Sequence, residues 1–259
     1  MSKPSYLIAV DIGNSTVKLG WFDARTPKLP NYPMPLRVEH FPTGQTPLAE
    51  WFEGLSEKDL LIWYVASVHR SGEAALYSWV RSKRPFDDFH VLTYEKLPLR
   101  IELEYPGRVG MDRLAAAVAA NERRSGRKPA IVVDTGTAIT VDLVNHHGAF
   151  LGGAILPGFR LTAEALAANT DQLPLTLYGG EDEPAALGKN TEAALKSGQF
   201  WGTIGAVREL IERMSEDLAE PPEVFVTGGD LKRLAPFMAK NAQFVPHMVL
   251  SGIMAAQRR

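Results

Sequence analysis

A polar turn that occurs twice, each time between two runs typical of β-strands, constrains the fold more than any other feature of the sequence. The first copy is Asp11-Ile-Gly13-Asn14-Ser15, between the apolar run 6–10 and the alternating run 16–22. Short runs rich in β-branched and aromatic residues, separated by glycine and small polar residues, predict a β-hairpin. The same residues can also serve only as turn formers, because Asp, Gly, Asn and Ser all favour tight turns.

The second copy is Asp134-Thr-Gly136-Thr137, again between two β-rich runs, 130–133 and 139–144. Its aspartate and glycine align with Asp11 and Gly13 of the first copy. Two equivalent turns in two similar halves are much harder to explain by turn chemistry than one turn alone. We therefore expect two related α/β halves.

The boundary between the halves is expected at Ser125-Gly-Arg-Lys-Pro129, because glycine and proline punctuate linkers. The preceding residues 111–124 are rich in alanine and lack glycine and proline, which predicts a helix. We expect two domains, 1–126 and 127–259. Further helices are predicted at 162–168, 191–218 and 252–259, and further strands at 36–41, 149–156 and 224–227.

Composition restricts the class of protein. The chain is 45% apolar and 22% charged, with a formal net charge of −2, so it has no overall attraction for nucleic acid or an anionic membrane. The absence of cysteine excludes disulfides, thiolate metal sites and a cysteine nucleophile. The apolar run near the N-terminus, 6–10, is too short for a signal peptide or a membrane span. A cytoplasmic protein is expected.

The first turn has the composition of a site for a metal-bound polyphosphate. The Asp11 carboxylate can hold Mg²⁺ directly or through water, and Gly13 lets the backbone approach a phosphate. Donors and a cation follow within the same turn and strand: Asn14, Ser15, Thr16 and Lys18. The chain contains no Gly-x-x-x-x-Gly-Lys-[Ser/Thr] P-loop that would compete with this assignment.

A second candidate site is Gly110-Met-Asp112-Arg113, at the start of the alanine-rich helix. The amides of the first helical turn and the helix dipole favour a bound anion. The guanidinium of Arg113 can bind a carboxylate through two parallel hydrogen bonds. The alternative is an acidic residue that only stabilises its helix, next to a surface arginine.

Six motifs, in one order and at suitable spacing, extend over nearly the whole chain. They are Asp11-x-Gly-Asn-Ser, Gly110-Met-Asp112-Arg113, Asp134-x-Gly-Thr-Ala-x-Thr140, Gly152-Gly-Ala-Ile-Leu-Pro-Gly158, Asn190-Thr191-x-x-Ala-x-x-Ser-Gly198 and Thr227-Gly-Gly-Asp230. Each motif is weak by itself. Together the series resembles that of the type III pantothenate kinases, within the actin-like, RNase H-like superfamily.

This resemblance implies a fold and an activity. The fold would be a duplicated RNase H-like (actin-like ATPase) α/β fold with an interdomain nucleotide cleft. The activity would be ATP-dependent phosphorylation of pantothenate to 4′-phosphopantothenate, the first step of coenzyme A biosynthesis. The cofactors would be ATP with Mg²⁺ and a monovalent cation, K⁺ or NH₄⁺. The assembly would be a homodimer, with the pantothenate pocket completed at the subunit interface.

The resemblance also implies roles for individual residues. Asp112 would be the general base, and Asp134 would bind K⁺. The substrate-binding residues would be Gly110, Met111, Asp112, Arg113 and Thr191. The nucleotide-binding residues would be Asp11, Ile12, Gly13, Asn14, Ser15, Thr16, Val17, Lys18 and Thr137. The segments 152–158 and 227–229 would surround the nucleotide.

One position departs from the family pattern. Many members have a tyrosine three residues before the proline that precedes Gly-x-Asp-Arg, but here that proline is Pro106 and the position holds Leu103. Tyr105 is a possible substitute. This departure leaves open a kinase of the same fold for another small hydroxy acid or sugar. A non-catalytic nucleotide-binding accessory protein is a separate alternative.

Overall fold

The structure is a computed structural model, and it describes residues 6–24, 32–53, 55, 59–179, 183–229 and 234–258. Asp230, the last residue of the sixth predicted motif, lies outside the described residues. The chain folds into two compact units. Unit 1 comprises Met1–Arg123 and His247–Arg259, and unit 2 comprises Arg124–Pro246.

Unit 1 is built on a five-stranded sheet, in which an antiparallel meander is extended by two parallel strands. The strands are β1 (Tyr6–Ile12), β2 (Thr16–Asp23), β3 (Arg37–Pro42), β4 (Leu61–Ser67) and β5 (Asp88–Val91). They lie in the order β3-β2-β1-β4-β5. β1, β2 and β3 pair antiparallel, whereas β4 is parallel to both β1 and β5.

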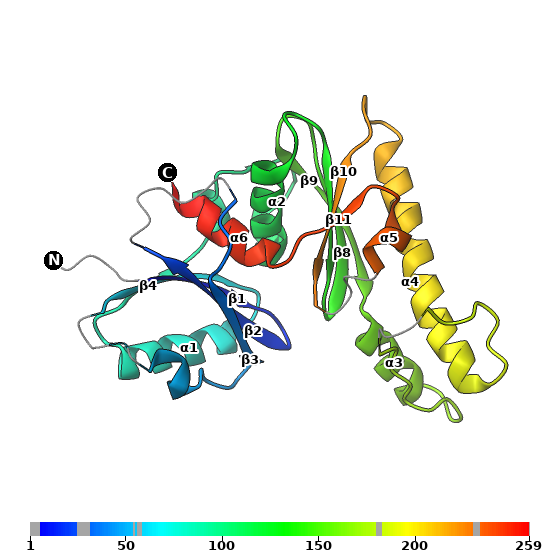
Figure 1. Ribbon diagram of the computed structural model, residues 1–259, viewed down its shortest axis with the longest axis horizontal. Coiled ribbons are helices and arrows are strands. Elements are labelled where there is room, and N and C mark those ends of the chain that lie inside the picture. Colours follow the sequence, from blue (N-terminus) through cyan, green and yellow to red (C-terminus); the bar gives the residue numbers. More distant parts are fainter. Residues whose placement is uncertain are drawn as a thin grey trace. The chain divides into compact units, whose positions relative to one another are not determined.

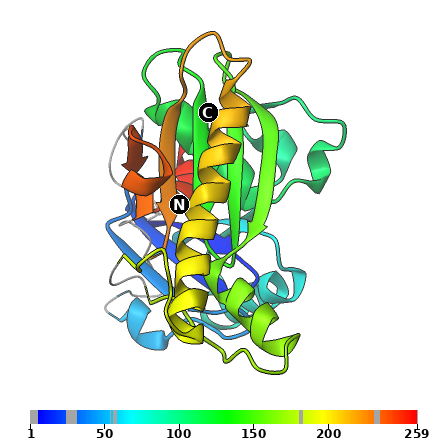
Figure 2. The same ribbon diagram turned by 90° about the vertical axis from the view of Figure 1, so that its right-hand side faces the viewer.

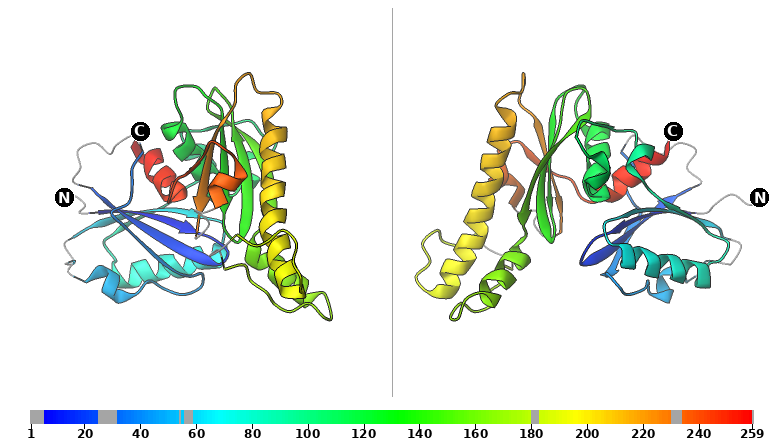
Figure 3. Two further views of the ribbon diagram at one scale, coloured as in Figure 1. Left: turned by 45° about the vertical axis from the view of Figure 1, so that its right-hand side comes forward. Right: turned by 180° about the vertical axis from the view of Figure 1, so that it is seen from behind.

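Helices cover both faces of this sheet (Figure 1). They are α1 (Arg70–Lys83), α2 (Met111–Arg123) and α6 (Met248–Ala255). Figure 3 shows α1 on the opposite side of the sheet from α2 and α6. Short elements complete the unit: the 3-10 helices η1 (Ala49–Phe52), η2 (Tyr94–Lys96), η3 (Pro106–Arg108) and η5 (Ala256–Arg258), and the strand β6 (Arg100–Ile101).

The core of unit 1 follows from the alternation of side chains along β1. Ile8, Val10 and Ile12 are fully buried and belong to one apolar cluster with Leu76 and Val80 of α1. Because successive strand residues point to opposite faces, the side chain of the intervening Asp11 lies on the face covered by α2 and α6.

Unit 2 has a sheet of the same construction. Its strands are β7 (Ala130–Thr135), β8 (Ala138–Val144), β9 (Ala149–Pro157), β10 (Glu223–Gly228) and β11 (Ala242–Phe244), and they lie in the order β11-β10-β7-β8-β9. Its helices are α3 (Phe159–Ala168), α4 (Thr191–Ser215) and α5 (Ala235–Met238). α4 runs along the sheet (Figure 2), and its Phe200, Ile204 and Val207 pack on the apolar face of β7 and β8.

The five strands of unit 2 correspond one to one with the five strands of the unit 1 sheet. β7, β8 and β9 repeat the antiparallel meander of β1, β2 and β3, and β10 and β11 repeat the parallel extension by β4 and β5. The predicted duplicated α/β fold is therefore confirmed. The helix predicted at 252–259 begins earlier, at Met248, and changes to a 3-10 turn after Ala255.

The division of the chain differs from the expected domains 1–126 and 127–259 in one respect. The first boundary falls at Arg123, near the expected linker, but the segment 247–259 belongs to unit 1. The reason is the close approach of α6 to α2. A Cβ atom on Gly252 would lie 1.8 Å from the carbonyl oxygen of Ala115, so the two helix backbones meet at a distance that only glycine allows.

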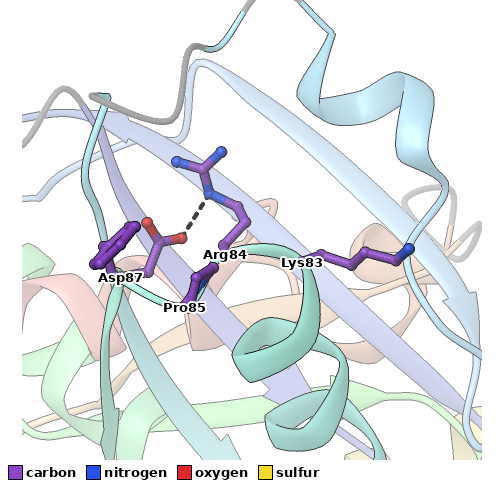
Figure 4. A pocket seen from close by; sticks show the side chains of 5 residues that line it. Lys83, Arg84, Pro85 and Asp87 are labelled. Atoms are coloured by element: carbon purple, nitrogen blue, oxygen red, sulfur yellow. Dashed lines mark hydrogen bonds and ion pairs between the residues drawn. The ribbon is translucent and has the colours of Figure 1, made fainter.

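A buried carboxylate ties the end of α1 to the start of β4. Asp87 is 2% exposed, and its Oδ1 accepts a hydrogen bond from the Leu61 amide at 3.1 Å. Its Oδ2 accepts hydrogen bonds from Trp63 Nε1 at 2.9 Å and from Arg84 Nε at 2.7 Å. Figure 4 shows the Arg84–Asp87 pair in a small pocket; Lys83 also lines this pocket, and its side chain points away from the pair. Both oxygens are satisfied, which is the condition for keeping a buried charge.

No helix in the described part of the chain is both long enough and apolar enough to span a membrane.

Candidate functional site

The first polar turn closes β1 onto β2 and exposes its tip. The amide of Gly13 donates a hydrogen bond to the Thr16 carbonyl at 3.0 Å, and the side chains of Asn14 and Ser15 are exposed. Thr43, which follows β3, donates from Oγ1 to the Gly13 carbonyl at 2.8 Å and from its amide to the Ser15 carbonyl at 3.0 Å. The sequence pattern gave no reason to select Thr43, because its role depends on contact with a turn about thirty residues earlier.

Asp11 and Lys18 form a cross-strand ion pair beside this turn. The two residues face each other in the β1–β2 register, and Lys18 Nζ lies 3.8 Å from Asp11 Oδ2. Asp11 is 7% exposed. One buried carboxylate, that of Asp11, and one partly exposed ammonium group, that of Lys18, therefore lie beside the turn. Burial lowers the pKa of His247, the residue that precedes α6, and the positive charge of Lys18 lowers that pKa further.

Asp112 is held in place by the first turn of α2. Its Oδ1 accepts a hydrogen bond from the amide of Arg113 at 2.8 Å, and both residues are half-buried. The Gly110 carbonyl accepts from the Leu114 amide at 3.3 Å as the helix begins. The predicted motif thus lies at the N-terminus of α2, where the helix dipole and the first-turn amides favour a bound anion.

The two predicted groups of unit 1 lie at the same edge of its sheet. The amide of Val68, just after β4, donates to the Ile12 carbonyl at the end of β1 at 3.0 Å. A Cβ atom on Gly110 would lie 3.4 Å from Cγ1 of Val68. Since β1 and β4 are parallel, their carboxyl ends meet there, and the structure brings the Asp11 turn and the Asp112 motif to this one edge.

The start of α1 also lies at this edge. His69 caps the helix, with its Nδ1 accepting a hydrogen bond from the Gly72 amide at 3.0 Å. A Cβ atom on Gly72 would lie 3.1 Å from Ile12 Cγ2 and 2.9 Å from Thr43 Cγ2, so the helix packs directly on the turn. Neither His69 nor Thr43 was selected from the sequence.

The second polar turn joins β7 to β8 at the equivalent place in unit 2 and is one residue shorter. Asp134 is half-buried and faces Thr140 in the β7–β8 register. The amide of Gly136 donates to the Ala138 carbonyl at 3.0 Å, and Thr137 is exposed at the tip.

Two further predicted motifs pack around the second turn. The amide of Gly158 donates to the Thr137 carbonyl at 3.0 Å. Gly228 has a φ of +113°, and a Cβ atom on it would lie 2.2 Å from the Thr135 carbonyl oxygen. Thr135 Oγ1 in turn donates to the Thr227 carbonyl at 2.8 Å. The lack of a side chain at Gly158 and at Gly228 is therefore explained by close backbone contact with this turn.

Thr191 takes no part in these contacts. It is the exposed first residue of α4, and Asn190 caps that helix by accepting from the Ala193 amide at 2.8 Å. Tyr105 is 54% exposed, and the Arg108 guanidinium lies 4.6 Å from the centre of its ring.

Each turn combines a carboxylate, which can bind a cation, with hydrogen-bond donors, which can bind phosphates. Mg²⁺ in kinase sites is usually held by one or two carboxylates and the substrate's phosphates, and Asp11 is a buried carboxylate beside an exposed turn rich in donors. Asp134 offers the same hard oxygen ligand in unit 2. Within the described residues there is no group of three or more His, Asp or Glu side chains that could bind a metal ion by themselves.

Comparison with known proteins gives the family. The family model described as type III pantothenate kinase matches residues 7–213. The type III pantothenate kinase of Paramagnetospirillum magneticum is 32% identical, and the alignment covers 98% of this chain and 97% of that protein. The enzyme of the same name from Acidiphilium cryptum is 40% identical, but that alignment covers 57% of this chain and about half, 52%, of the relative.

Solved structures agree on the fold. A putative 2-dehydro-3-deoxygalactonokinase from Sinorhizobium meliloti superimposes with a TM-score of 0.54 over 98% of both chains, at 15% sequence identity. At this identity the likeness extends to the fold alone, and it agrees with the two α/β units described above. With the match of the family model over most of its length, the chain belongs to the type III pantothenate kinase family.

Proposed function

We propose that this protein transfers the γ-phosphoryl group of ATP to pantothenate, giving 4′-phosphopantothenate and ADP in the first step of coenzyme A biosynthesis. The observation that carries the proposal is the meeting of the Asp11 turn and the Asp112 motif at one edge of the unit 1 sheet. A phosphate-binding turn and a carboxylate base at the same edge are the two parts that phosphoryl transfer to a hydroxyl requires. The cytoplasmic location expected from the sequence belongs to the same proposal.

In this mechanism Asp112 removes the proton of the pantothenate hydroxyl. The hydroxyl oxygen forms a bond to the γ-phosphorus while the bond from that phosphorus to the ADP oxygen breaks. Oδ1 of Asp112 accepts the Arg113 amide hydrogen, and we assign the proton to the other carboxylate oxygen, Oδ2. Gly110 and Met111 line the substrate beside it, and the Arg113 guanidinium binds the pantothenate carboxylate.

The turns bind the nucleotide. In unit 1 the run Asp11–Lys18 supplies amides, hydroxyls and one ammonium group to the phosphates, and in unit 2 Thr137 adds a further contact. Asp11 would hold Mg²⁺, and Asp134 would hold K⁺ or NH₄⁺; when bound, these cations would offset the negative charge of the phosphates. The protein itself supplies mainly position and electrostatic stabilisation.

The same proposal includes a homodimer, with Thr191 reaching the pantothenate pocket. The segment of the chain that precedes Thr191 carries five exposed leucine side chains among its described residues, which a second copy of the chain would cover. They are Leu161 (43% exposed), Leu166 (36%), Leu175 (58%), Leu177 (49%) and Leu187 (77%). Light scattering at assay concentration is expected to give twice the 28.5 kDa chain mass, and a fully active monomer would remove this part of the proposal.

The decisive experiment is a phosphorylation assay on a panel of acceptors. Pantothenate, other small hydroxy acids and simple sugars are each supplied with Mg-ATP, and ADP and phosphorylated product are both measured. We expect product only with pantothenate. A different preferred acceptor would favour the related kinase that the Leu103 position leaves open. ATP binding without any phosphorylated product would favour the accessory protein.

A further inference from the structure

Two residues at equivalent positions, Thr43 and Gly158, donate hydrogen bonds to the two polar turns. Thr43 follows Pro42, the last residue of β3, and Gly158 follows Pro157, the last residue of β9. In the strand registers Pro42 faces Thr16 and Pro157 faces Ala138, the first residues of β2 and β8. Thr43 and Gly158 therefore occupy the same place in the two halves.

Both residues make the same backbone hydrogen bond. The Thr43 amide donates to the Ser15 carbonyl at 3.0 Å, and the Gly158 amide donates to the Thr137 carbonyl at 3.0 Å. A contact that recurs in both halves of a duplicated fold depends on the shared arrangement of the turn, although the residue types differ.

The difference between the two residues follows from the length of each turn. Two residues, 14 and 15, separate Gly13 from Thr16, and the Thr43 hydroxyl bonds a second carbonyl of this longer turn, that of Gly13, at 2.8 Å. In the shorter turn only Thr137 separates Gly136 from Ala138.

The shorter turn leaves no room for a side chain behind it. A Cβ atom on Gly158 would lie 2.3 Å from the Gly136 carbonyl oxygen and 2.5 Å from that of Thr137. The longer turn is thus held by a hydroxyl, and the shorter turn by direct backbone contact.

The contacts that orient these carbonyl groups also orient the N–H groups of the same peptide bonds. In a trans peptide the C=O and the following N–H point in opposite directions, and the described residues contain no cis peptide. With the carbonyls of Gly13 and Ser15 held toward Thr43, the amides of Asn14 and Thr16 point away from it. In unit 2 the same geometry turns the Ala138 amide away from Gly158.

We propose that Thr43 and Gly158 are positioning residues for ATP: they do not touch the nucleotide, but they hold the amides of both turns in the orientation that receives its phosphates. This inference rests on the proposed function, in which the turns bind ATP. Amide groups that are already oriented before ATP binds need no reorganisation when the phosphates arrive. Loss of the contact made by Thr43 or Gly158 is therefore expected to weaken ATP binding more than it weakens the fold.

The test is a pair of substitutions at Thr43. Thr43→Val removes the hydroxyl and keeps the shape, whereas Thr43→Ser keeps the hydroxyl. Thr46→Val, at an exposed threonine of the same loop, is the matched control. We expect Thr43→Val to raise the Kd for Mg-ATP by titration calorimetry, and the KM for ATP, by about three- to tenfold, as for the loss of one hydrogen bond. Thr43→Ser is expected to restore both values, and the KM for pantothenate is expected to stay the same.

Gly158→Ala is the corresponding change in unit 2 and is expected to weaken Mg-ATP binding by at least about tenfold, because two carbonyls must move. The circular dichroism spectrum and Tm of each variant separate this effect from unfolding. Wild-type ATP affinity in Thr43→Val, or equal increases in the KM values of both substrates, would overturn the inference while the proposed function stands. Failure of the wild-type protein to bind Mg-ATP would instead remove the proposed function.

Discussion

A Cβ atom on Gly110 would lie 2.4 Å from Oδ1 of Asp112, well inside any allowed contact. The backbone of Gly110 does not have a positive φ, so an alanine could adopt its conformation. The absence of a side chain at residue 110 is therefore what makes room for the Asp112 carboxylate in its observed position.

We expect Gly110→Ala to displace the Asp112 carboxylate with little loss of stability, because a side-chain end moves more easily than the backbone. Since misplacement of a catalytic group by about 1 Å can cost up to about 100-fold in rate, kcat/KM for pantothenate is expected to fall at least about tenfold. Gly205→Ala is the control, because a Cβ there meets no atom within 4 Å. Steady-state kinetics measure the loss of activity, and Tm shows whether stability is retained. Wild-type activity in Gly110→Ala would contradict the role given to Asp112.

Asp112→Asn is expected to lower kcat by on the order of 100-fold or more while leaving the affinity for ATP nearly unchanged, as for removal of a general base. The asparagine oxygen can still accept the Arg113 amide hydrogen, so the local structure should be retained. If the aspartate only stabilised its helix, the loss would be about 0.3–1 kcal/mol of stability with catalysis intact. Near wild-type turnover by a folded Asp112→Asn enzyme would remove the central mechanistic proposal.

Activity is expected to require Mg²⁺ and to be strongly stimulated by K⁺ or NH₄⁺ relative to Na⁺. The physical reason is the half-buried Asp134 carboxylate beside the second turn, to which we assign the monovalent cation. Initial rates in chloride salts of the three cations at equal ionic strength test this assignment. The rate of Asp134→Asn is expected to change less between the salts than the rate of the wild type. Equal rates in all three salts would rule it out.

Asp87→Asn is expected to destabilise unit 1 without a direct effect on the site. The change leaves the Arg84 guanidinium, whose side chain is 10% exposed, without its carboxylate partner. Breaking a buried pair in this way typically costs about 3–5 kcal/mol. Urea unfolding provides the measurement, and Glu164→Gln, which breaks the exposed Arg160–Glu164 pair, should unfold like the wild type. Equal stability of the two variants would show that the Asp87 hydrogen bonds contribute little.

Much of the architecture was predictable from the sequence, because its signals are local. The β1–β2 and β7–β8 hairpins each arise from two strand patterns within about twenty residues, and the alignment of Asp11 with Asp134 was enough to predict a duplicated fold. The motif series also predicted the family. The roles given to Asp112, Asp134 and Thr191 stay predictions.

The tertiary structure alone decided which distant segments meet. No local pattern joins Thr43 to Gly13, or Asp87 to Trp63, because each pair becomes adjacent only when the strands between them pack. The same holds for the C-terminal helix, which the linker signal assigned to the second half. Strand and turn propensities act over a few residues, whereas the close approach of Gly252 to Ala115 depends on two helix surfaces that fit only after the sheet of unit 1 has formed.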